Sequence, residues 1–150
     1  MGTKRIGLAR VEALMENLKR DLDLSSSTLT GGSVSGATGL STAVQSVAAT
    51  GSDESDAAAI AATAPLVLVS AADGTTGVIL PALSSVPAGS IFIVANTAAA
   101  ILKVYPNTDD KVFPLADDAD VTVAANCVLI CVAADATQWV GIEGTVISGA

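Results

Sequence analysis

Short segments in which apolar and polar residues alternate run from Pro65 to the end of the chain, and they constrain its fold more than any other feature. They recur about every ten residues and are separated by turns containing Gly, Pro, Asn or Asp, which is typical of proteins built from short strands. The alternation is plain where Thr122 lies between Val121 and Val123. We predict eight strands, over residues 66–70, 77–80, 90–95, 101–105, 111–113, 120–124, 127–133 and 138–143.

The number and spacing of these strands favour a mainly β domain in which two sheets enclose the core, or a barrel. No stretch between them is long enough for the crossover helices that parallel sheets usually need. Hydrophobic residues make up 51% of the 150 residues, but aromatic residues only 3%. Such small side chains suit sheet packing and offer few anchors for a deep ligand pocket. We therefore predict that residues 65–150 form an antiparallel β-sandwich of the jelly-roll type.

Charge separates the front of the chain from this domain. Residues 1–24 hold five of the seven basic residues and four acidic ones, whereas the rest holds two basic and eleven acidic residues. Apolar residues in this front segment recur at intervals of three and four, which predicts an amphipathic helix with Thr3 as its N-cap. The apolar stripe of the helix consists of Leu8, Val11, Met15, Leu18 and Leu22.

An isolated helix of this length is marginally stable in water, so something must cover its stripe. Either the body of the same chain or copies of the same helix from neighbouring subunits could do so. Because the stripe follows an a/d heptad spacing, we favour self-association and assign these five residues to an oligomer interface. The β-domain could equally provide the contact between copies.

Residues 25–64 form a separate segment, which we predict to be a linker or arm. Its first half is rich in Ser, Thr and Gly and cannot bury enough apolar surface to offset its ordering entropy. Leu40, Val44 and Val47 then mark a short helix or an irregular arm. The acidic cluster of Asp53, Glu54 and Asp56 predicts a solvated turn before the first core strand.

The residue types present point away from catalysis. The chain contains no histidine, which removes Ser-His-Asp and Cys-His arrangements, histidine metal ligands and the usual proton shuttle. No phosphate-binding, dinucleotide-binding or nucleophile-elbow motif occurs. We therefore predict no enzymatic activity and no catalytic, cofactor-binding or metal-binding residues.

Acidic residues are the one remaining set that could serve a cation or an acid-catalysed hydrolysis. Their spacing does not match an EF-hand loop, and a sugar cleft would need more aromatic residues. We expect a solvated loop at this cluster, which comprises Asp109, Asp110, Asp117, Asp118 and Asp120. An enzyme that acts on a carbohydrate through these carboxylates is kept as a rival hypothesis.

Three other features have structural interpretations. Cys127 and Cys131 lie four residues apart in one predicted strand, about 13 Å along one face, so we predict buried thiols that do not pair with each other. Trp139 is expected to fill the core or close one edge of the sandwich rather than to serve as a stacking platform. The uncharged stretch 74–102 contains Pro and Gly, so we predict no membrane span, and the N-terminus matches no targeting signal.

The net charge of −8 and the isoelectric point of about 4.1 argue against binding to free nucleic acid. Outside residues 1–24 the basic residues are Lys103 and Lys111 alone. An acidic body that repels phosphate is suited to remaining soluble as separate subunits. We therefore predict protein partners, and neither nucleic acid nor a membrane.

The C-terminal half contains a recognisable order of elements: a strand ending in Leu80-Pro81, an Ala88-Gly89 turn, a strand reaching Asn96, a strand over 102–106 and a closing hairpin over 135–139. In this order it resembles a β-domain of virion structural proteins of tailed bacteriophages. The opening 22 residues from Thr3 are similar to N-terminal helices of phage structural proteins. Together the two regions cover about two thirds of the chain.

This resemblance implies a virion structural protein, and the short length favours a capsid decoration (cement) protein. As a homotrimer it would bind the major capsid protein at the outer surface of the head, after synthesis in the cytoplasm of the bacterial host. The alternative is a tail or head-fibre adaptor that binds another virion protein or a host glycan.

Overall fold

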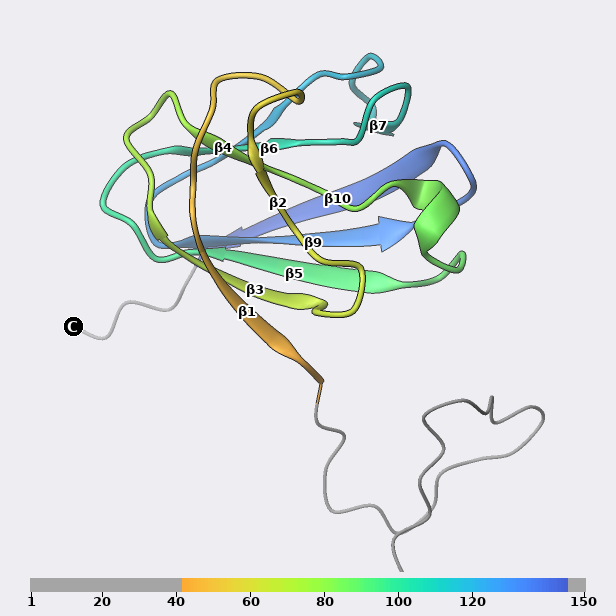
Figure 1. Cartoon of the computed structure of the whole chain (residues 1–150), viewed down its shortest axis with the longest axis horizontal. Helices are drawn as coiled ribbons and strands as arrows, with labels where there is room; N and C mark the ends of the chain where they lie inside the picture. Colours follow the sequence, from red (N-terminus) through yellow and green to blue (C-terminus); the bar gives the residue numbers. More distant parts are fainter. Residues whose placement is uncertain (1–41, 146–150) are drawn as a thin grey trace, which may run out of the picture. The chain divides into compact units, whose positions relative to one another are not determined.

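A computed structural model describes residues 42–145 of the chain (Figure 1). These residues contain ten strands and one turn of 3₁₀ helix, η1 (Leu83–Ser85). The strands are β1 (Val44–Ala48), β2 (Ala58–Ala59), β3 (Leu66–Ala71), β4 (Gly77–Ile79), β5 (Ile91–Asn96), β6 (Leu102–Tyr105), β7 (Lys111–Phe113), β8 (Val121–Val123), β9 (Cys127–Ala133) and β10 (Gln138–Thr145).

The strands form two sheets that share one apolar core. The larger sheet has the order β1-β3-β5-β9-β10-β7, and the smaller one has the order β2-β4-β6-β8. Figure 1 shows β3, β5, β9 and β10 lying next to one another, with β4 and β6 on the other side of the core. The core contains side chains from both sheets, including Val67, Val94, Leu102 and Trp139.

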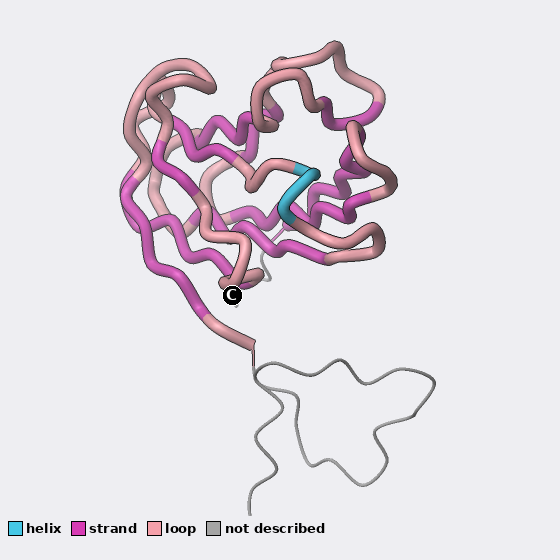
Figure 2. The backbone as a smooth tube through the Cα atoms, turned by 45° about the vertical axis from the view of Figure 1, so that its right-hand side comes forward, coloured by secondary structure: helices cyan, strands magenta, loops and turns pink. Residues whose placement is uncertain are grey.

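From β1 to β6 the chain passes from one sheet to the other with each successive strand. Figure 2 shows the described chain as strands (magenta) and loops (pink), with one short helical turn (cyan). Strands β1, β3 and β5 enter the larger sheet, and strands β2, β4 and β6 enter the smaller one. Within each of these two sets, neighbouring strands run parallel. Val44, Leu66 and Ile93 therefore occupy equivalent positions in three successive coils. The arrangement is solenoid-like.

The second half of the domain closes this coil with antiparallel strands. Strand β9 pairs antiparallel with both β5 and β10, and β8 pairs antiparallel with β6. Strand β7 completes the far edge by running parallel to β10. The larger sheet is therefore mixed, with its antiparallel strands placed between parallel pairs.

The prediction of a mainly β domain is confirmed, and each of the eight predicted strands overlaps an observed one. The prediction of antiparallel pairing is wrong for five of the eight strand pairs. We had required a helix to connect parallel strands. Here the connection between parallel neighbours in one sheet passes through a strand of the other sheet, which provides the crossover length without a helix.

Within residues 25–64, which we predict to be a linker or arm, the structure places β1 and β2 in the second half. Val44 and Val47 belong to a strand rather than to a helix or an irregular arm. Val47 packs against the core, and Ile60 is buried within it. The turn predicted at the acidic cluster is present at residues 54–56. The predicted helix over 1–24 and residues 25–41 of the predicted linker lie outside the described residues.

Glycine is required at one position where two neighbouring strands of the smaller sheet, β4 and β6, pair with each other. Gly77 in β4 lies under the ring of Tyr105, and a Cβ atom added to it would be 2.5 Å from Tyr105 Cε2. The Tyr105 hydroxyl in turn donates a hydrogen bond to the Ser52 carbonyl in the β1–β2 loop. The absence of a side chain at position 77 thus lets Tyr105 reach across β4 and join the third coil to the first.

Candidate functional site

The side of the larger sheet that faces away from the core is the most distinctive surface of the described residues. Strand pairing aligns its outward-pointing residues in three rows that cross the sheet. The rows are Val44, Leu66, Ile93, Ile130 and Ile142; Ser46, Leu68, Ala95, Val128 and Gly144; and Ile91, Val132, Val140 and Phe113. We call this surface, defined by these fourteen residues, the outer face.

The outer face is apolar and exposed at the same time. Seven of the nine large hydrophobic residues that are exposed in the described chain belong to it. The exposed fractions reach 62% at Ile142, 57% at Phe113 and 56% at Val44, at opposite ends of the sheet. Isolated exposed apolar side chains are common, but a contiguous patch of them marks a surface that another molecule covers.

Strand geometry explains why one set of residues is buried and the other is not. Successive side chains of a strand point to opposite sides of the sheet. In β9 the inward residues Cys127, Leu129 and Cys131 are buried, whereas Ile130 between them is exposed. Both faces of this strand are therefore apolar, although the smaller sheet covers only one of them.

Charge is placed away from the outer face. None of the fourteen residues is ionisable, whereas residues 42–145 carry eleven acidic and two basic residues. All of these acids except Glu143 lie in the connections between strands. Glu143 has the inward alternation of β10, and its Oε1 accepts a hydrogen bond from the Ala124 N–H at 3.2 Å. A partner that binds the outer face thus meets aliphatic and aromatic groups, with small polar Ser46 among them.

The predicted solvated acidic loop is only partly solvated. Asp109 and Asp118 both adopt left-handed backbone conformations, and the Asp109 N–H donates to Asp118 Oδ1 at 2.8 Å. Asp110, however, is buried, and its Oδ2 accepts a hydrogen bond from the Leu83 N–H at 3.0 Å. Burial raises the pKa of the Asp110 carboxyl, and the neighbouring Asp109 and Asp118 carboxylates add to this. This carboxylate anchors η1 to the β6–β7 connection.

The remaining acids of the cluster form ion pairs near the surface. Lys111 Nζ lies 3.7 Å from Asp117 Oδ1, and Lys103 Nζ lies 3.8 Å from Asp120 Oδ1. Pairs of this exposure contribute little to stability. Within residues 42–145 no three acidic or sulfur ligands are grouped so that they could hold a metal ion.

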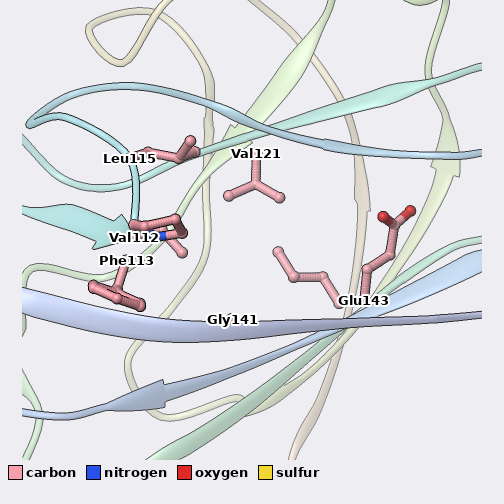
Figure 3. A pocket seen from close by; sticks show the side chains of 8 residues that line it. Val112, Phe113, Leu115, Val121, Gly141 and Glu143 are labelled. Carbon is pink, nitrogen blue, oxygen red and sulfur yellow. The ribbon is translucent and has the colours of Figure 1, made fainter.

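An apolar cavity of about 230 Å³ opens between the two sheets at the β7 end of the larger one. Figure 3 shows Leu115 and Val121 on one side of it and Gly141 on the other, with the Glu143 carboxylate at its edge. Its volume is below that of typical small-molecule sites. Because one carboxylate is its only ionisable group, the cavity can accept an apolar side chain but presents no catalytic arrangement.

Both cysteines and the tryptophan take the structural positions predicted for them. Cys127 and Cys131 are free, buried and on the same face of β9, and burial raises the pKa of the Cys131 thiol to about 12. Trp139 is completely buried and packs edge-on against Phe92, with ring centroids 5.6 Å apart. These residues belong to the core rather than to a binding site.

Asn96, which the phage resemblance singled out, closes one end of the core. Its side chain is completely buried at the end of β5. The amide group donates to the carbonyls of Ala100, Val123 and Ala124 at 2.9, 3.1 and 3.0 Å, and its oxygen accepts from the Ala98 N–H at 3.1 Å. The residue thus joins the larger sheet to β8 of the smaller one.

The interface predicted from Leu8, Val11, Met15, Leu18 and Leu22 lies outside the described residues. Our sequence reasoning did not identify the outer face. A signal for it is present, because β5 and β9 each contain several consecutive apolar residues where a sheet with one solvated face would alternate with polar ones. In β9 the same run also contains the two cysteines, for which burial on one face is the prediction.

No helix within residues 42–145 is long and apolar enough to cross a bilayer. Comparison of the whole chain with protein-family models, curated proteins and solved structures found no match.

Proposed function

We propose that this chain is a non-enzymatic structural protein of a tailed-phage virion, and that it acts as a trimeric decoration (cement) protein of the head. The observation that carries this proposal is the uncharged, exposed apolar outer face of the larger sheet. A surface of this kind gains free energy when another protein covers it, whereas it offers little to a nucleic acid or a polar small molecule.

The other supports are the sequence resemblance and the way charge is distributed. A decoration protein must remain soluble as free subunits and then add to an assembled shell in many copies. The acidic connections favour solubility through mutual repulsion, and several weak contacts per trimer can add up to firm attachment. In this proposal the partners are the major capsid protein and other copies of the chain, and the site of action is the outer capsid surface.

A fibre or adaptor role is the second candidate, and the solenoid-like coils favour it. Strand β1 lies at the open edge of the larger sheet, and coils of this kind can be extended by adding strands in the same direction. Such a protein would be attached to the virion at a few positions instead of covering the head.

Quantitative mass spectrometry of virions of the encoding phage tests the choice. A decoration protein is expected at a copy number similar to that of the major capsid protein, and an adaptor at a small fraction of it. The purified full chain should also bind shells that lack it and raise the temperature at which they release their contents. Absence of the chain from virions would overturn both candidates.

A further inference from the structure

We infer that the outer face is the surface at which copies of this chain associate with one another. The inference rests on the proposed function in one respect, namely that the protein works as an oligomer, and it adds the location of the contact. The occupant of the outer face is another copy of the chain: in a trimer the three outer faces turn toward the threefold axis, and each meets parts of both neighbouring faces.

The first argument is the continuity of the apolar rows. The row from Val44 to Ile142 crosses five strands in unbroken register, and the other two rows run beside it. A sheet face made of Val, Ile and Leu packs well against another of the same composition, at a distance of about 10 Å between sheets. The surface is therefore complementary to itself without any particular pairing of donors and acceptors.

The second argument is electrostatic. Two copies of a body with eleven acidic and two basic residues repel each other in most orientations. The outer face is the broad region where they can meet without bringing carboxylates together, because the acids lie in connections between strands or, at Glu143, on the inward side of β10. A partner of opposite charge would instead be attracted to the acidic connections. The absence of ionisable groups on the outer face thus favours a like-charged partner, which a second copy is.

The third argument is size. Six strands span about 24 Å at the usual spacing of about 4.8 Å, and three rows with their side chains extend about 18 Å along the strands, which amounts to about 450 Å². Three such faces around a threefold axis bury about 1,350 Å² in the whole trimer, or about 450 Å² for each pair of copies. Contacts of this size are typical of weak association that depends on concentration.

The test uses the full-length protein and two matched pairs of substitutions. Ile130→Thr with Ile142→Thr removes two neighbouring apolar groups from the β9–β10 end of one row while keeping β-branched side chains. Ile101→Thr with Leu115→Thr changes exposed apolar residues outside the outer face and serves as the control. Sedimentation and light scattering over a range of concentrations report the mass, and circular dichroism reports the fold.

The wild type is expected to form trimers of about 44 kDa, three times the chain mass of 14.7 kDa. Ile130→Thr/Ile142→Thr should raise the concentration needed for half-assembly at least about tenfold with an unchanged spectrum, and the control pair should not. Should the first pair fail to fold, Val140→Thr and Phe113→Thr, tested singly, provide the same measurement on another row. A dimer that is lost in the same variants would support the location of the contact and reject the trimer.

Three results would overturn the inference. One is a wild type that is monomeric at every concentration. Another is an oligomer that survives all outer-face variants but dissociates in Val11→Ser/Leu18→Ser, which would assign association to the N-terminal stripe. The third is a monomer that binds shells through the outer face, which would make the occupant a capsid protein, keep the role as a decoration protein and reject its trimeric form. An oligomer that needs the outer face but is absent from virions would support the location of the contact and reject the proposed function.

Discussion

The two sides of the six-stranded sheet have similar chemistry and different surroundings. The inner side carries Val67, Val94 and Leu129, which are buried beneath the smaller sheet, and the outer side carries Leu68, Ile93 and Ile130, which have no such cover in the described chain. Burial in a core depends on what the chain folds over a residue as well as on the residue itself. An apolar side chain on the inner side should therefore stabilise the folded domain, and one on the outer side should act mainly through association.

The largest expected effect tests the inner side. Trp139→Ala removes a completely buried ring packed against Phe92, and it should lower the free energy of unfolding by about 3–5 kcal/mol. The indole N–H has no hydrogen-bond partner in the described residues, so this cost reflects packing alone. Val140→Ala, one residue along β10 and on the outer side, should cost less than about 1 kcal/mol. Chemical denaturation at low protein concentration measures both values, and equal costs would contradict the difference between the two sides.

Asn96→Ala tests how much a buried, fully hydrogen-bonded side chain at the end of the core contributes to stability. The substitution leaves the Ala98 N–H and the carbonyls of Val123 and Ala124 without this partner, and we expect a loss of about 2–4 kcal/mol. Thr97→Ala, which removes one hydroxyl bond to the Val69 carbonyl at an exposed position, is the control and should cost about 1 kcal/mol or less. Thermal unfolding followed by circular dichroism would show whether the two substitutions differ in this order.

The third test concerns Asp110, a buried carboxyl group that accepts a hydrogen bond from the backbone of another connection. Asp110→Ala leaves the Leu83 N–H without its acceptor and should cost about 1–3 kcal/mol, whereas Asp110→Asn retains an acceptor and should cost less. Because the pKa of Asp110 is raised in the folded state, the folded protein binds this proton more tightly than the unfolded one. The stability of the wild type relative to Asp110→Asn should therefore rise as pH falls through the folded pKa toward 3.8. Denaturation curves at several pH values measure the slope, and a slope of the opposite sign would reject this account.

Asp73, an exposed carboxylate, should show the opposite pH dependence with the smallest effect. Its Oδ1 accepts hydrogen bonds from the backbone N–H and hydroxyl groups of Thr75 and Thr76, and these hold the pKa of Asp73 well below 3.8. The stabilisation is thus fully present above pH 3.8 and is lost as pH falls through the lower folded pKa. Relative to Asp73→Asn, the wild type should lose stability over that acidic range in the same denaturation series. An advantage that persists in strong acid would show that these hydrogen bonds do not depend on the charge.

Local pattern was sufficient to place the strands. Alternation in 120–124 and the Gly, Asn and Asp turns predicted elements that the structure contains, because both signals depend on residues close together in the sequence. The same signals failed at β1 and β2. There Ala and Ser obscure the alternation, and contacts of Val47 and Ile60 with distant residues hold the strands in place.

The outer face and the burial of Asp110 depend on contacts between residues that are far apart in the sequence. An apolar run such as Ile91 to Ala95 shows that a strand can be apolar on both sides, but not which side the chain will cover. Asp110 lies among acidic neighbours in a polar stretch, and only the approach of Leu83 from another connection buries it. The sequence could therefore indicate that both sides of a strand are apolar, but it could not show which side forms the exposed outer face.

The sequence by itself determined that this chain forms short strands around a core of small aliphatic residues, because alternation and turn formation are local properties. Only the tertiary structure decided that strands β1 to β6 alternate between two sheets and pair in parallel within each sheet. The same alternation of residues is compatible with either direction of pairing. Tertiary structure also decided that one apolar side of the larger sheet is buried and the other exposed. The physical reason is that a side chain is buried only when another part of the chain, often distant in sequence, packs over it. The smaller sheet packs on one side of the larger sheet and leaves the other side exposed.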